Sequence, residues 1–171
     1  VLPPVCNEQL MKMMKRTLNI SSFAYYLSLA NCCFPGSARH TVKNLQDKDR
    51  NNLLGRTQTH LSFTSEEEQF GQQELSKMGL PEKASFVGFI GRDSAYLNNS
   101  LPDVDWKYHD YRNMDIQNFL PAMEELTKRE YFTLRMGYVV QKPLDVDNPK
   151  VIDYATHFRT DFLDIYLCSK C

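Results

Sequence analysis

Apolar side chains in the first part of the chain recur at the spacing of a helix, at Leu10, Met13, Met14 and Leu18. This pattern predicts a helix over residues 7–30, with Asn7 as its N-terminal cap. The apolar and aromatic stretch 23–29 either continues this helix or belongs to a second helix that starts at Ser21 or Ser22. We expect this stretch to pack against a core.

Residues 64–78 show the clearest helical signal in the chain. Thr64 is followed by three glutamates, Glu66, Glu67 and Glu68. This order is typical of a capping box at a helix start, where carboxylates also interact well with the helix dipole. Gly79 then supplies the conformational freedom that ends many helices.

Two further helices are expected in the second half of the chain. Asp115 is placed to cap a helix that runs to about Arg129, with apolar residues on one side. Pro121 lies inside this segment, so we expect the first turn to be offset or 3₁₀. Thr160 is placed to cap a final helix that contains Phe162 and other apolar residues.

Between these helices lie two short apolar runs, 85–90 and 131–136. The first is apolar on both faces, as in a buried strand of a parallel sheet. The order strand, helix, strand, helix is that of a doubly wound α/β layer. The long connection 137–158 contains at most short extended pieces, at 137–140 and 151–154, and no full third strand. Two strands do not form a stable sheet alone. We therefore expect a fragment of a longer protein whose open edge is covered by a loop or a second copy.

The predicted fold class is α/β, with a partial doubly wound, Rossmann-like parallel sheet preceded by a helical segment. The expected division places a mainly helical segment at residues 1–80 and the first half of an α/β domain, truncated at its C-terminus, at residues 81–171. The final helix should expose apolar residues, including Ile165 and Tyr166, and so favour a homo-oligomer.

Composition narrows the class of protein. The formal net charge is −1 and the mean hydropathy is −0.47. No half of the chain is basic enough to make nucleic acid the default partner, and no apolar run is long enough for a membrane span. The basic stretch from Arg39 to His60 is typical of a solvated loop, or else meets an anion.

The five cysteines form no regular framework, which is typical of a reducing compartment. With no leader pattern at Val1, this indicates a cytoplasmic protein. Cys168 and Cys171 form a lone CxxC, for which a thiol-redox or metal role is the less favoured interpretation, and no metal or other cofactor is expected.

Candidate chemistry lies where the strands end, because ligands of open α/β sheets bind beyond the carboxyl ends of the strands. Arg92 follows the first strand and Arg135 lies at the end of the second. A guanidinium donates two bonds to a phosphate, so the pair favours an anion site, although an arginine that only pins a loop to an aspartate remains the alternative. Further candidates come from the long loop 92–114 and the second strand end: Asp93, Ser94, His109, Tyr111, Arg112, Asn113 and Gly137.

Four segments together resemble a bacterial family of glycosyltransferases encoded near surface-polysaccharide genes. They are 86–97, 108–115, 134–137 and 159–166, which read FVGFIGRDSAYL, YHDYRNMD, LRMG and RTDFLDIY. The resemblance covers about residues 60–171 and implies a distant relation to fucosyltransferases of the GT-B fold. In those enzymes a His-x-Arg ends the first strand of the nucleotide domain; here Ile90-Gly91-Arg92 keeps the arginine and lacks the histidine.

The resemblance implies transfer of a sugar from a nucleotide diphosphate sugar to a polysaccharide or glycan acceptor. Arg92, with Asp93, would act at the reacting centre, and Arg135 would help to neutralise the leaving diphosphate. Because the family continues past the last residue of this sequence, the resemblance also implies an incomplete donor site and an inactive fragment. A non-catalytic α/β binding or interaction module that oligomerises is the alternative.

Overall fold

The computed structural model describes residues 5–40, 49 and 52–171. The chain divides into two compact units between Phe63 and Thr64. Within the described residues, no helix combines the length and the apolar character needed to cross a membrane.

The described part of the first unit contains three helices and one 3₁₀ turn: α1 (Glu8–Thr17), α2 (Phe23–Cys32), η1 (Ser37–Arg39) and α3 (Leu53–Arg56). The predicted cap is confirmed, since the Asn7 side chain accepts a bond from the Leu10 N–H at 2.8 Å. The chain forms two helices rather than one, because Leu18 adopts an extended conformation that ends α1. Some of the basic stretch after Arg39, including Lys43, lies outside the described residues.

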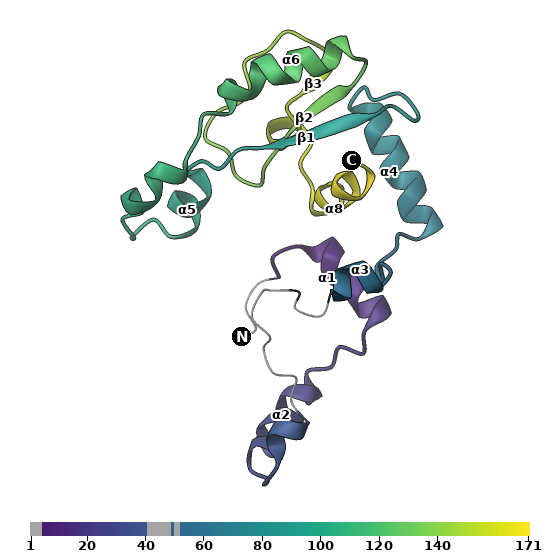
Figure 1. Ribbon diagram of the computed structural model, residues 1–171, viewed down its shortest axis with the longest axis vertical. Helices are drawn as coiled ribbons and strands as arrows, with labels where there is room; N and C mark the ends of the chain where they lie inside the picture. The colour runs from purple at the N-terminus through teal and green to yellow at the C-terminus, as the bar shows by residue number, and fades with distance from the viewer. Residues whose placement is uncertain (1–4, 41–48, 50–51) are drawn as a thin grey trace. The chain divides into compact units, whose positions relative to one another are not determined.

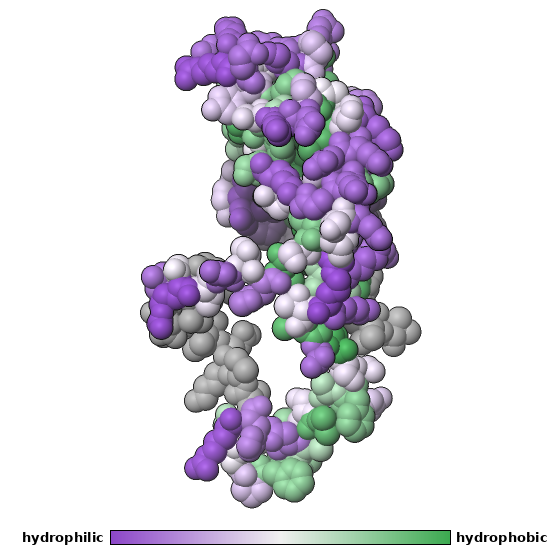
Figure 2. Space-filling model, turned by 90° about the vertical axis from the view of Figure 1, so that its right-hand side faces the viewer, coloured by the Kyte–Doolittle hydropathy of each residue, from purple (hydrophilic) through white to green (hydrophobic). Residues whose placement is uncertain are grey.

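Helix α2 does not pack as the sequence predicts. None of its residues is buried, and its aromatic side chains are largely exposed. Phe23 is 62% exposed and Tyr26 is 64% exposed, and Figure 2 shows hydrophobic surface over this segment. The stripe of apolar residues is therefore a surface in this structure, not a core.

The second unit is built on a three-stranded parallel sheet with the strand order β1-β2-β3 (Figure 1). Strand β1 (Phe86–Ile90) pairs with β2 (Phe132–Met136), as the sequence predicts. A short extended piece does occur within 151–154, as expected, but the expectation of no third strand is wrong, because this piece is β3 (Val151–Ile152), which pairs with β2 in parallel. A two-residue strand is too short to produce a period in the sequence. The fold is thus mixed α/β with a small parallel sheet.

Helices lie on both faces of this sheet (Figure 1). On one face lie the 3₁₀ turn η3 (Ile116–Phe119) and α6 (Leu120–Lys128), which confirms the offset first turn expected from Pro121. Met123 of α6 is fully buried in a cluster with Ile116, Leu144 and Val151. On the other face lies α8 (Asp161–Lys170), which begins at its predicted cap Thr160.

Strand β2, rather than β1, is the buried strand. Thr133, Leu134 and Arg135 are all buried, whereas Ile90 at the end of β1 is 74% exposed. The prediction of a buried first strand is wrong because β1 lies at the edge of the sheet. Its run of apolar residues therefore faces solvent along one side.

Helix α4 (Ser65–Lys77) belongs to this second unit, whereas the sequence-based division placed it in the helical segment of residues 1–80. Its capping box is confirmed: the Thr64 and Glu67 side chains each bond to the backbone of the other residue. The ring of Tyr166 in α8 packs directly over Gly71 of α4. Tyr166 is only 1% exposed, so the prediction that it lies uncovered on the last helix is wrong.

Candidate functional site

A cavity of about 260 Å³ lies at the carboxyl ends of β1 and β2. It is bordered by Gly91, which follows β1, and by Arg135 near the end of β2. Three other predicted site residues line it, namely Asp93, Ser94 and Asn113, together with Gln141 and Lys142 of the loop after β2. The topology therefore brings some of the predicted residues together where a parallel sheet binds ligands.

Arg135 is a structural residue at the base of this cavity. Its side chain is 3% exposed, and its Nη1 donates to Asp153 Oδ1 at 3.1 Å and to the Lys142 carbonyl at 3.0 Å. In the parallel register Thr133 lies beside Val151. Two residues further along both strands, Arg135 therefore lies beside Asp153, on the same face of the sheet. The buried ion pair takes the place of the phosphate contact expected from the sequence.

The Asp153 carboxylate is held by bonds from both sides. Burial alone would raise its pKa, but the Leu144 N–H at 2.8 Å, the Thr156 side chain and Arg135 together lower the pKa below its ordinary value. Asp153 therefore stays ionised and neutralises Arg135 in the interior. Sequence reasoning missed this residue, although it follows β3 just as the candidate arginines follow their strands.

Asp93 joins two loops at the cavity mouth. Its Oδ1 accepts the Ala95 N–H at 2.8 Å at the start of α5 (Ala95–Ser100), and its Oδ2 accepts the Gln141 N–H at 3.0 Å. Both carboxylate oxygens already accept backbone bonds. This arrangement is better suited to fixing the loops than to removing a proton from a substrate.

Arg92 is a predicted residue at a strand end whose cationic group stays available. Its carbonyl accepts the Met114 N–H at 2.8 Å, which holds the backbone after β1. Across the described residues of the chain, its guanidinium has no hydrogen bond or ion pair, and the residue is half-buried. Arg92 therefore presents an unneutralised positive charge just beyond the carboxyl end of β1.

Arg92 itself does not line the cavity, and neither do the remaining predicted residues. Tyr111 is 83% exposed and Arg112 is also exposed, both in the 3₁₀ turn η2 (Lys107–Arg112). The ring of His109 stacks on Trp106 with centroids 6.0 Å apart. Gly137 has a packing role, since a Cβ there would lie 2.7 Å from Val140.

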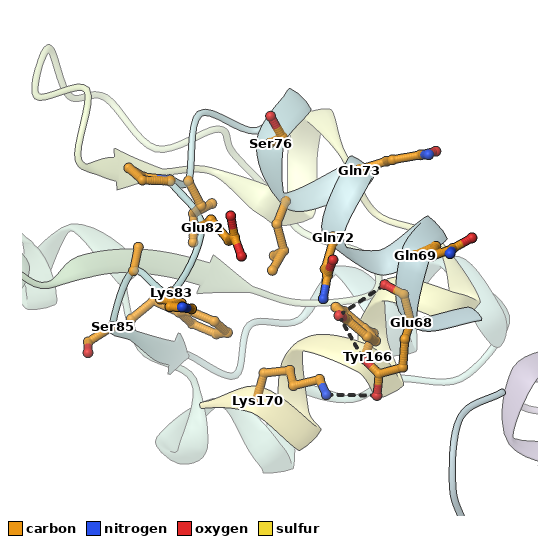
Figure 3. A pocket seen from close by; sticks show the side chains of 15 residues that line it. Glu68, Gln69, Gln72, Gln73, Ser76, Glu82, Lys83, Ser85, Tyr166 and Lys170 are labelled. Atoms are coloured by element: carbon orange, nitrogen blue, oxygen red, sulfur yellow. Dashed lines mark hydrogen bonds and ion pairs between the residues drawn. The ribbon is translucent and has the colours of Figure 1, made fainter. Parts of the chain in front are cut away.

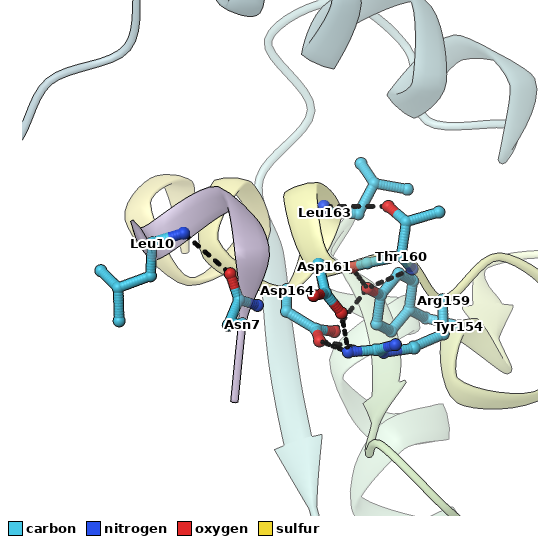
Figure 4. A network of polar contacts seen from close by, with 8 residues as sticks. All are labelled: Asn7, Leu10, Tyr154, Arg159, Thr160, Asp161, Leu163 and Asp164. Atoms are coloured by element: carbon cyan, nitrogen blue, oxygen red, sulfur yellow. Dashed lines mark hydrogen bonds and ion pairs between the residues drawn. The ribbon is translucent and has the colours of Figure 1, made fainter. Parts of the chain in front are cut away.

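A second polar network, which the sequence-based site did not include, links the short helix α7 (Tyr154–His157) to the start of α8 (Figure 4). Arg159 donates to Asp161 and, at 2.8 Å, to Asp164. Its guanidinium carbon lies 4.1 Å from the ring centroid of Tyr138. Burial, together with a 2.6 Å bond to Asp164, raises the pKa of Tyr154 far above its ordinary value. The network is internally satisfied and rigidifies the start of α8.

A groove of about 780 Å³ lies between α4, the 80–85 connection and α8 (Figure 3). Leu75, Leu80 and Phe86 form its apolar portion, and glutamines of α4 line its rim. Burial raises the pKa of Tyr166 to about 12, and its hydroxyl donates to Glu68 at 3.1 Å.

Among the described residues, no group of three or more metal-binding side chains is close enough to hold an ion. Cys168 and Cys171 are free and exposed as residues. The Cys168 thiol is nevertheless partly buried, which raises its pKa. Comparison with known proteins finds no matching family model, no matching curated protein and no matching solved structure.

Proposed function

We propose that the second unit belongs to a GT-B-like, Rossmann-type nucleotide-sugar domain, and that its cavity at the carboxyl ends of β1 and β2 receives the diphosphate of a sugar nucleotide. The activity would be glycosyl transfer to a glycan acceptor. The observation that carries the proposal is Arg92, whose guanidinium has no partner in the described chain and whose two neighbours, Gly91 and Asp93, line this cavity.

Three features support an anion at this place. Arg92 follows the first strand of a parallel sheet with helices on both faces, which is where such folds bind phosphates. Ser94 and Asn113 add uncharged polar side chains to the cavity wall. Asp93 is occupied by two backbone N–H groups, which reduces its repulsion of an anion.

The structure changes the role that the sequence gives to Arg135. Because Asp153 neutralises it, Arg135 fixes the floor of the cavity and the loop at Lys142 rather than contacting the diphosphate. In glycosyl transfer, Arg92 would stabilise the negative charge that develops on the leaving diphosphate.

The test is direct binding of UDP, GDP and pyrophosphate, measured by calorimetry. We expect binding by the wild-type chain, loss of binding in Arg92→Ala, and little recovery in Arg92→Lys, since an ammonium does not reproduce the planar fork. Arg129→Ala is the matched control, because Arg129 lies before β2, at the opposite end of the strands, and is 67% exposed. Absence of binding to all three ligands, or equal binding by Arg92→Ala, contradicts the proposal.

One observation favours a non-catalytic interaction module as the second candidate. Arg135 forms the buried loop-fixing pair that such a module requires. If Arg92 also served only to fix a loop, Arg92→Ala would lower the melting temperature even in the absence of a ligand. Thermal unfolding of the same variant, with and without UDP, separates the two functions.

A further inference from the structure

Strand β1 presents one side without a partner strand. In the described residues of the chain the sheet order is β1-β2-β3, so β2 occupies only one side of β1. The Ser85 carbonyl accepts the Phe132 N–H of β2 at 3.0 Å. Since backbone groups alternate in direction along a strand, Val87 and Phe89 also face β2. Phe86, Gly88 and Ile90 therefore direct their N–H and C=O groups outward.

This open side lacks two of the features that keep edge strands single, namely charged side chains and proline. From Ala84 to Gly91 the chain contains no charged residue and no proline. Ile90 is 74% exposed and Gly88 is also exposed. An uncharged, apolar edge with free backbone groups is a template for another strand.

We propose that β1 pairs edge to edge and antiparallel with β1 of a second copy of this chain, about a two-fold axis at Gly88. In this register Gly88 faces Gly88, and Phe86 faces Ile90 of the second copy. Each of the three outward-facing residues then forms a hydrogen-bonded pair with a residue of the second copy. Every residue of the five-residue strand thus has a hydrogen-bonding partner strand on the side that it faces. The two three-stranded sheets become one continuous sheet.

Side-chain positions agree with this register. Phe86 and Tyr166 both line the groove between α4, the 80–85 connection and α8. Residues that are opposite in an antiparallel pair lie on the same face, so Ile90 of the second copy would lie at this groove. The most exposed apolar side chain of β1 thus meets an apolar wall.

The charges that flank the strand are compatible with the same axis. Glu82 and Lys83 precede β1, and Arg92 and Asp93 follow it. The two-fold axis brings the start of one strand to the end of the other, so each end carries both signs and no like-charge cluster forms. This balance of charge favours a second copy, rather than a highly charged partner, as the occupant.

The test is the oligomeric state, measured by sedimentation over a wide concentration range. We expect a dimer for the wild-type chain and monomers for Ile90→Lys and Ile90→Pro. A lysine charges the edge, and a proline removes only an outward N–H, which an edge strand tolerates. Leu101→Lys is the matched control, because Leu101 is also exposed, at 50%, but lies away from the strand. Far-ultraviolet circular dichroism checks that every variant is folded.

A cross-link tests the register itself. In a background whose five native cysteines are replaced by serine, Gly88→Cys should form a dimer on oxidation, because paired Cα atoms about 5.5 Å apart allow a disulfide. Ser85→Cys should not cross-link, since the axis does not bring residue 85 near itself. A monomeric wild-type chain, or a dimer that persists in Ile90→Lys and Ile90→Pro, overturns the proposal. Cross-linking at residue 85 but not at residue 88 overturns it as well.

Discussion

The guanidinium of Arg135 in β2 and the carboxylate of Asp153, which follows β3, form a buried ion pair 3.1 Å long across neighbouring strands. Both side chains are at least nine-tenths buried. The pair lies under the cavity at the strand ends and joins the third strand to the second. It therefore links the stability of the sheet to the shape of the candidate site.

Breaking this pair on one side should destabilise the second unit strongly. Arg135→Met leaves Asp153 charged and buried, for which the expected cost is about 3–5 kcal/mol. The double variant Arg135→Met, Asp153→Leu should recover most of the loss, because an apolar pair has no desolvation penalty. Urea unfolding followed by the fluorescence of the single tryptophan, Trp106, measures both. Equal loss in the single and double variants would show that packing, not charge, dominates.

The same pair should make the stability of the second unit sensitive to acid. The pKa of Asp153 in the folded state lies below its ordinary value of 3.8. Its stabilising contribution is therefore fully present above pH 3.8 and is lost as the pH falls through the folded-state pKa. Asp153→Asn should lower stability at neutral pH and show a smaller further decrease below pH 3.8. The comparison is urea unfolding between about pH 6 and about pH 2, with the exposed Asp145→Asn as the control.

Tyr154 should influence stability at the alkaline end. Its pKa is raised in the folded state, so its contribution is present below the ordinary value of 10.0 and decreases as the pH rises above it. Tyr154→Phe removes the bonds to Asp164 and Thr160, with an expected cost of about 1–2 kcal/mol near neutral pH. Unfolding at about pH 8 and about pH 11 should show a smaller alkaline decrease in the variant. An unchanged alkaline slope would assign the effect to another group.

The contact of Gly71 with Tyr166 should reverse the usual effect of replacing a helical glycine. Alanine is favoured over glycine in a helix by about 1 kcal/mol. Here, however, the added Cβ would lie 2.2 Å from the Tyr166 ring, so Gly71→Ala should destabilise by about 1–3 kcal/mol. The control Gln73→Ala, exposed on the same helix, should have little effect. In a Tyr166→Leu background, Gly71→Ala should become neutral or stabilising.

Local signals predicted local structure well in this chain. Thr64, Asp115 and Thr160 cap helices where the sequence places them, because a cap needs only a side-chain oxygen and a nearby N–H. The parallel pairing of β1 with β2 also followed from the strand–helix–strand order. The predictions that failed concern contacts between segments far apart in the chain. An apolar run does not state whether its strand is central or at an edge, as Ile90 shows.

The candidate site also combines features that the sequence predicts with features that depend on distant contacts. That Arg92 and Arg135 follow strands could be read from the chain, but which of them keeps a free guanidinium depends on Asp153, eighteen residues after Arg135. Asp153 follows a two-residue strand, which is too short to leave a period in the sequence. Asn113 and Tyr111 are only two residues apart in the chain, yet Asn113 lines the cavity and Tyr111 is exposed to solvent. The sequence alone does not distinguish these two positions.

The packing of α4 against α8 has a consequence for how the second unit folds. The Tyr166 hydroxyl and Glu68 are 98 residues apart in the chain, and Lys170 reaches Glu68 over 102 residues. Such contacts raise the contact order, and folding slows when distant segments must meet before they gain stability. The strands and α6 form over shorter separations, so α4 and α8 should dock after them. Amide protons of α4 would then be protected late in pulsed hydrogen exchange, after those of β2.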